Sequence, residues 1–198
     1  MTVIEMRIDE KGSVVYAVSP TDDSMTNDDY GLLGYKWTIT ANYYVNPVNK
    51  NGLAQSGVVN TIKASADTWD KETSFTVFSY KGTTTKTAGK YDRMNVVSFG
   101  KYRRGVIGVT YLWSSQGRLL ETDTMLNTYY NWSLTGAAGK MDVENIMTHE
   151  FGHWCGLDDL YSDADYWLTM YGYSDYGLTY GRTLGLGDII GLKAVYGA

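Results

Sequence analysis

Alternating apolar and polar residues predict a series of short β-strands through the middle of the chain. Residues 36–45 alternate like a half-buried strand, and further β-rich runs follow, separated by Gly, Lys and Thr. These runs are 76–80, 95–100, 105–113 and a segment that opens at residue 118. A sheet with several short strands is therefore expected.

Three other segments show the spacing of amphipathic helices. Residues 56–75 place Val58, Val59, Ile62, Ala66 and Trp69 on one face. Residues 141–155 and 187–197 predict a second and a third helix. The predicted N-caps of the three helices are Ser56, Asp142 and Asp188, in that order.

The order of these elements predicts an α+β fold, in which helices back a mixed sheet. The first 34 residues have a different pattern. Residues 3–8 and 13–18 flank a Gly turn and predict a β-hairpin, and a polar, acidic stretch follows. We therefore expect an N-terminal hairpin and linker at 1–34 and a main domain at 35–198.

Composition narrows the function classes. Hydrophobic residues make up 43% and charged residues 20%, which favours a packed core over disorder. The net charge of −5 argues against a nucleic-acid or anionic-membrane surface, and no apolar run reaches the roughly 18 residues of a membrane span. The single cysteine, Cys155, excludes an intrachain disulfide, and we interpret it as a buried apolar residue.

The chain's two histidines lie four residues apart in one segment, HEFGHWCGLDD at 149–159. On a helix this spacing puts His149 and His153 on one face, where both imidazoles can reach one metal ion. Gly156 can end the helix in the left-handed conformation and let the chain bring Asp159 back to the ion. Glu150 lies about 100° round the helix, within reach of a water on the metal.

Two imidazoles and one carboxylate leave the fourth position of a tetrahedral zinc open, which is typical of a catalytic site. The expected mechanism is peptide hydrolysis by a zinc-activated water, with Glu150 as general base. Zinc is thus the expected catalytic cofactor.

The segment resembles the metzincin clan of zinc peptidases, whose signature is HExxHxxGxxH or HExxHxxGxxD. LTMYG at 168–172 is similar to the clan's methionine turn and offers Met170 for it. Around residues 66–78, 121–132 and 187–197 the chain looks like the matrixin family, while the Asp ligand is snapalysin-like. The resemblance covers residues 35–198 and indicates a bacterial or archaeal, matrixin-like metzincin.

This resemblance implies a metzincin-type zincin fold: a twisted, mixed five-stranded sheet backed by two helices, with a short C-terminal subdomain ending in a helix. It implies a secreted, monomeric endopeptidase acting on proteins or peptides, although the chain starts without a signal peptide. Met170 would form a hydrophobic base under the metal, and Tyr171 and Tyr173 would wall the substrate pocket.

The chain departs from the matrixins in three respects. Asp159 replaces a third His, no cysteine-switch motif precedes the domain, and no further histidine exists for a second, structural zinc. Calcium ligands are a further candidate role for Asp158, Asp163 and Asp165, but these residues follow no calcium-loop spacing, which favours a solvated loop.

Several alternatives stay open. The run 105–113 is either an exposed edge strand, with which a peptide substrate could pair, or an ordinary inner strand. Residues 1–34 are a pro-segment remnant, an inhibitory flap or an added hairpin. The chain could also be an inactive metal-bound binding or adhesion module on the same scaffold, or a zinc hydrolase that acts on other substrates.

Overall fold

The fold is built around a wide mixed sheet. The computed structural model describes residues 1–9 and 25–198, and its main sheet has the strand order β11-β1-β6-β7-β5-β3-β4. The strands are β1 (Thr2–Ile8), β3 (Ala41–Asn46), β4 (Phe78–Thr83), β5 (Asn95–Gly100), β6 (Val106–Ser115), β7 (Arg118–Asn127) and β11 (Tyr173–Ser174). β4, β3, β5 and β7 run parallel, and β6 is antiparallel to both of its neighbours.

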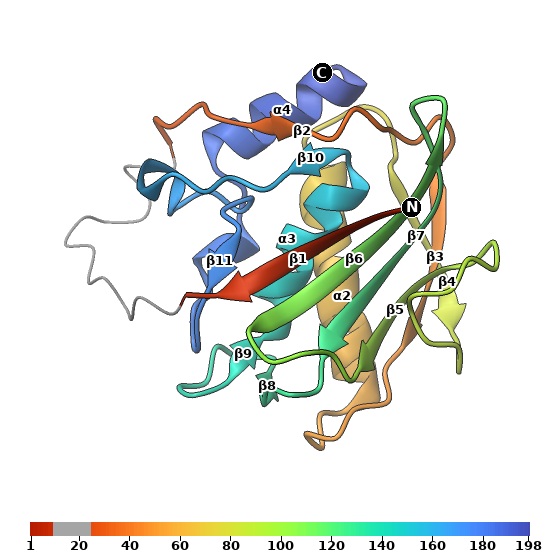
Figure 1. The fold of residues 1–198 in the computed structure, drawn as a ribbon, viewed down its shortest axis with the longest axis vertical. Helices are drawn as coiled ribbons and strands as arrows, with labels where there is room; N and C mark the ends of the chain where they lie inside the picture. Colours follow the sequence, from red (N-terminus) through yellow and green to blue (C-terminus); the bar gives the residue numbers. More distant parts are fainter. Residues whose placement is uncertain (10–24) are drawn as a thin grey trace.

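Two helices lie side by side behind this sheet, and a third closes the chain beside β2 and β10 (Figure 1). The three are α2 (Gln55–Asp70), α3 (Val143–Trp154) and α4 (Leu186–Tyr196), with 3-10 turns η1 (Asp163–Asp165) and η2 (Tyr180–Arg182). Two small strand pairs complete the fold: β2 (Gly31–Leu32) with β10 (Leu157–Asp158), and β8 (Trp132–Ser133) with β9 (Met141–Asp142). No helix in the described ranges is long and apolar enough to cross a membrane.

Aromatic side chains fill the space between the sheet and the two central helices. Trp69 of α2 is fully buried, and its indole N–H donates to the carbonyl of Thr148 in α3 at 2.8 Å. Phe151 of α3 packs on Tyr43 and Phe78, which lie on neighbouring strands of the sheet. Helix α3 is therefore held on two sides, and this fixes the residues that it carries.

The structure confirms the α+β class with a mixed sheet, and it differs from expectation at several elements. The sheet has seven strands rather than five, because β1 and β11 extend it beyond β6. Helix α2 starts at Gln55 after Ala54, so Ser56 is not its N-cap. Asp188 is likewise not a cap residue: it lies at the third position of α4, where its carboxylate accepts from the Gly185 N–H.

The N-terminal segment lies against the main domain. β1 pairs with β6 and with β11, and Gly31–Leu32 pairs with Leu157–Asp158. The second strand of the predicted hairpin, residues 13–18, falls outside the described residues. Residues on both sides of Gly34 therefore contribute strands to the surroundings of the site.

Candidate metal centre

Helix α3 presents both histidines to one point. The predicted cap is confirmed: the Asp142 carboxylate accepts from the Asn145 N–H at 3.0 Å and starts the helix. His149 and His153 then lie one turn apart and are both fully buried. Their Nε2 atoms face each other at 3.1 Å.

A reversal after α3 returns the chain to the histidines. Gly156 has φ +94°, and a Cβ there would also clash with the Tyr35 carbonyl, so two constraints favour glycine. After β10, Asp159 places Oδ1 3.2 Å from His149 Nε2 and 3.4 Å from His153 Nε2. The structure thus brings together the three residues that the spacing selects as ligands.

Both rings are oriented through their other nitrogen. His149 Nδ1 lies 2.8 Å from the carbonyl of Thr169, and His153 Nδ1 lies 2.9 Å from that of Leu157. A carbonyl can only accept, so each Nδ1 carries a proton and each Nε2 of a neutral ring presents a lone pair. Two lone pairs and a carboxylate oxygen therefore point at one spot, an arrangement that needs a cation or a proton.

Without a metal, a proton can meet this need. Burial opposes the charged form of His153, but the Asp159 carboxylate outweighs it and raises the pKa of His153 to about 9. Burial would also raise the pKa of Asp159, yet the two imidazoles hold that pKa well below its usual range. A bound divalent cation would replace the shared proton, as metal binding to histidine generally does.

The spacing of the three atoms fits zinc. Ligand atoms 2.0–2.1 Å from one tetrahedral zinc lie about 3.3 Å from one another, close to the 3.1, 3.2 and 3.4 Å observed here. The Asp159 side chain is 3% exposed, and its Oδ1 has no hydrogen-bond donor. His149, His153 and Asp159 are therefore the residues that could hold a metal ion.

Glu150 lies beside this cluster with one oxygen held and the other unpaired. Its Oε2 accepts from the Thr110 hydroxyl of β6 at 2.5 Å, while its buried Oε1 has no partner. A Cβ at Gly108 would clash with Oε1, so glycine on β6 makes room for the carboxylate. Burial raises the pKa of Glu150, and His149, His153 and the Thr110 hydroxyl offset part of that rise.

Thr110 is the end of a buried hydrogen-bond chain with one direction. The Trp154 indole N–H can only donate, and it does so to Thr124 Oγ1 at 2.9 Å. Thr124 and Thr110 share a 2.6 Å hydrogen bond. The Glu150 carboxylate can only accept, so the Thr110 hydroxyl donates to it and accepts in turn from the Thr124 hydroxyl. Sequence reasoning missed Thr110, although a polar residue on the otherwise apolar face of 106–112 was a usable signal.

The segment after η1 lies beneath the cluster. Met170 is 2% exposed, and a Cβ at Gly152 in α3 would clash with its sulfur, so Met170 lies directly against the helix between the two histidines. Asp188 fixes this segment, because its carboxylate accepts from the Thr169 and Met170 N–H groups at 2.8 and 3.0 Å. Through the Thr169 carbonyl this also orients His149.

One tyrosine binds Asp159 directly, and two further tyrosines follow it in a row of ring contacts. The Tyr161 hydroxyl donates to Asp159 Oδ2 at 2.9 Å, which leaves Oδ1 directed at the histidines. The Tyr173 ring contacts both Tyr161 and Tyr171, with centroids 5.5 and 5.7 Å apart. Tyr161, which the sequence analysis did not select, thus contacts a predicted ligand directly, whereas Tyr173 and Tyr171 are connected to Asp159 only through ring contacts with Tyr161 and with each other.

The acidic residues considered for calcium do not gather. Among the described residues, His149, His153 and Asp159 form the one group of three or more side chains placed like metal ligands. Asp165 Oδ1 instead accepts from the Asn27 side chain, and Asp158 Oδ1 from the Asp159 N–H. The sequence left open whether 105–113 is an exposed edge strand or an inner strand, and in this structure β6 is an inner strand, because β1 pairs along it.

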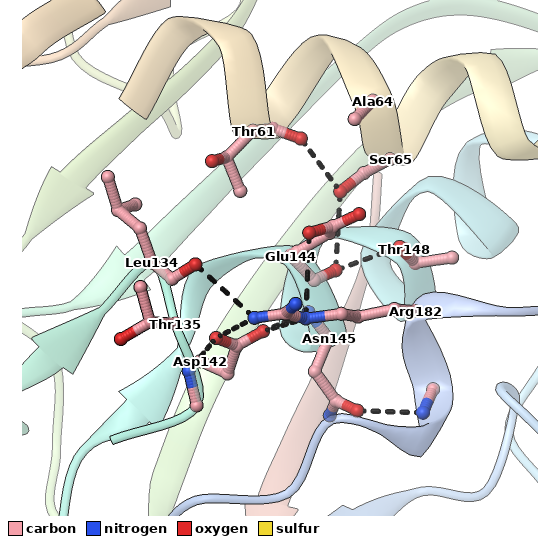
Figure 2. Close-up of polar contacts among 12 residues, drawn as sticks. Thr61, Ala64, Ser65, Leu134, Thr135, Asp142, Glu144, Asn145, Thr148 and Arg182 are labelled. Carbon is pink, nitrogen blue, oxygen red and sulfur yellow. Dashed lines mark hydrogen bonds and ion pairs between the residues drawn. The ribbon is translucent and has the colours of Figure 1, made fainter. Parts of the chain in front are cut away.

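The N-terminus of α3 is anchored by an arginine that sequence reasoning missed. Arg182 of η2 binds both oxygens of Asp142, at 2.9 and 2.7 Å, and lies 3.5 Å from Glu144 (Figure 2). On the other side, the Ser65 hydroxyl of α2 donates to the Glu144 carbonyl at 3.2 Å. The start of the histidine helix is thereby tied to two other elements.

Comparisons with known proteins identify no family for this chain. The chain matches no family model, and no curated protein matches it. The assignment of a function therefore depends on the cluster and its surroundings.

Proposed function

We propose that this chain is a secreted zinc-dependent endopeptidase of the metzincin type. The observation that supports it most is the convergence of three buried ligand atoms with the unpaired oxygen of a fourth group. His149, His153 and Asp159 bring their atoms within 4.8 Å of one another, and Glu150 Oε1 is buried beside them without a donor. A purely structural metal site has no use for such a carboxylate.

The protein groups around the ion have separate roles. Zinc, when bound, supplies a Lewis acid and lowers the pKa of its water. Glu150 accepts a proton at Oε1 and returns it to the leaving amine, while Thr110 holds Oε2. The Thr169 and Leu157 carbonyls keep both histidine rings in the tautomer that binds metal. Tyr171 and Tyr173 contact the substrate side chain beyond the cleaved bond.

The test combines metal analysis with a cleavage assay on the purified full chain. We expect one zinc per chain and cleavage of a quenched fluorescent peptide library that a chelator abolishes. Glu150→Gln should keep the zinc and lose about 10²–10⁴-fold in rate, the usual contribution of a general base. Glu144→Gln is the matched control on the same helix. Wild-type cleavage by Glu150→Gln would refute the proposal.

The competing function is a metal-bound module without catalysis. It is favoured by one observation: β1 pairs along β6 and closes the sheet beside the cluster. Zinc binding without cleavage of any peptide, in the parent and in variants that loosen β1, would support this second function.

A further inference from the structure

β1 fills a slot one strand wide, between β6 and β11, next to the candidate metal centre. In the sheet order it separates β6 from β11, and it runs antiparallel to the former and parallel to the latter (Figure 1). Neighbouring strands lie about 4.8 Å apart, so β6 and β11 stand about 10 Å from each other across β1. Without β1, β6 would present a free edge.

The main chain of β1 is held alternately from both sides of this slot. The Arg7 N–H donates to Gly172, the Ile8 N–H to Gly105 and the Asp9 N–H to Ser174, at 3.1, 3.0 and 3.0 Å. These are backbone bonds, which any extended peptide of the same direction can form.

The register of β1 brings it level with Glu150. Met6 lies opposite Gly108 and Ile4 lies opposite Thr110, the two β6 residues that contact the Glu150 carboxylate. Residues directly opposite in an antiparallel pair point to the same face. Ile4 and Met6, 8% and 3% exposed, therefore point toward the side of the sheet where α3 lies.

β1 also borders the ligand side of the centre. A hollow of about 320 Å³ is lined by residues of β1 together with Asp158, Asp159 and Tyr161. β1 and the predicted ligand Asp159 therefore border the same hollow.

One side chain gives β1 an advantage over other peptides. The Glu5 carboxylate accepts from the Tyr102 hydroxyl at 2.9 Å and pairs with Arg103. These two residues follow β5 and lie outside the backbone slot. Glu5 thus favours the β1 sequence in a slot whose backbone hydrogen bonds any extended peptide could form.

We propose that β1 occupies the peptide-binding groove of this centre, as an intramolecular competitor of its substrates. The groove takes an extended peptide antiparallel to β6, with apolar side chains at the two alternate positions now filled by Ile4 and Met6. The inference rests on the proposed function, because it names that site's substrate class and its regulation.

The test loosens β1 within the full chain. Met6→Asp places a charge where Met6 is buried, and Leu120→Asp, on β7 and 50% exposed, is its matched control away from the groove. A second variant, Glu5→Ala, removes the acceptor of both Tyr102 and Arg103 without adding a buried charge, in case Met6→Asp does not fold. With zinc, both loosened proteins should cleave a quenched peptide at least tenfold faster than the parent and the control.

A binding readout separates this inference from the peptidase proposal. In the Glu150→Gln background with zinc, a labelled peptide of the β1 sequence TVIEMRID should bind the loosened variants at least tenfold more tightly than the parent. Tighter binding without cleavage in any variant would support the groove and overturn the peptidase. Folded loosened variants that neither bind this peptide nor cleave faster than the parent would overturn the inference, even if the parent is an active peptidase.

Discussion

At the scale of single residues, the proposed base is controlled by one hydroxyl. Thr110→Val keeps the shape of the side chain but removes the donor to Glu150 Oε2, and it leaves Thr124 without an acceptor for its proton. We expect cleavage to fall about 10- to 100-fold, because losing a hydrogen bond to a charged group costs about 1.5–3 kcal/mol. Zinc content should not change.

Thr110→Ser supplies the control for this prediction. Serine keeps the hydroxyl and should restore most of the rate lost in Thr110→Val. Equal rates in both variants would mean that the hydroxyl does not position Glu150. Rates and zinc content are measured on the same preparations, so that a lower rate caused by lost zinc is not attributed to a misplaced Glu150.

Local sequence rules found the residues whose roles are set within a few positions. Spacing selected His149, His153 and Asp159, which the structure brings together, and Gly156 has the left-handed conformation that a glycine reversal requires. Thr110 was missed because its position beside the site depends on packing between β6 and α3, whereas Tyr161 lies two residues after Asp159, and its contact is local. The polar Thr110 stands out on an apolar strand face, but its partner lies 40 positions later, and no local pattern connects the two residues.

At the scale of elements, the start of α3 depends on Arg182. The Asp142 side chain is fully buried, and Arg182→Met would leave it only the N–H donors of Gly136 and Asn145. We expect the free energy of unfolding to fall by about 2–3 kcal/mol, somewhat below the loss for a completely buried pair. Urea unfolding measures it.

The exposed Arg118 provides the comparison for Arg182. Arg118→Met removes the same charge from the surface and should change stability by less than about 0.5 kcal/mol. Similar losses in the two variants would show that net charge, rather than the Asp142 contact, is responsible.

The type of each element could be predicted from the sequence more readily than the strand with which it pairs. Periodicity located α2, α3, α4 and the central strands, because each signal is local. It could not tell that β1 pairs with β6 across about a hundred residues, since a strand pattern does not name its partner. The same limit explains why the sequence left 105–113 open between an edge strand and an inner strand.

At the scale of the whole molecule, buried carboxyls make stability depend on pH. Burial raises the pKa of Asp123 to about 7, although three backbone N–H groups bind the carboxyl and offset part of the rise. An unfolded aspartate titrates near about 3.9. Between these values the folded chain keeps a proton that the unfolded chain releases, so stability falls as pH rises toward 7.

Asp123→Asn isolates this contribution, since the amide does not titrate. The difference in unfolding free energy between wild type and variant should be about 2 kcal/mol larger at pH 5 than at pH 8. Urea titrations of both proteins at the two pH values measure it. A difference that stays constant, or grows with pH, would show that the carboxyl is ionised in the folded chain throughout.

A bound metal would couple the site to the stability of the whole fold. The three ligand residues come from α3 and from the return after β10, so they are together only in the folded chain. Zinc at about 100 times its dissociation constant should then raise the free energy of unfolding by about 2.7 kcal/mol. Asp159→Asn should lose most of this increment, while Asp163→Asn, exposed on η1, should keep it. Thermal unfolding with and without zinc gives the answer without a substrate. Calcium should not replace zinc, because it prefers six to eight oxygen ligands, and an equal calcium effect would point away from the histidine cluster.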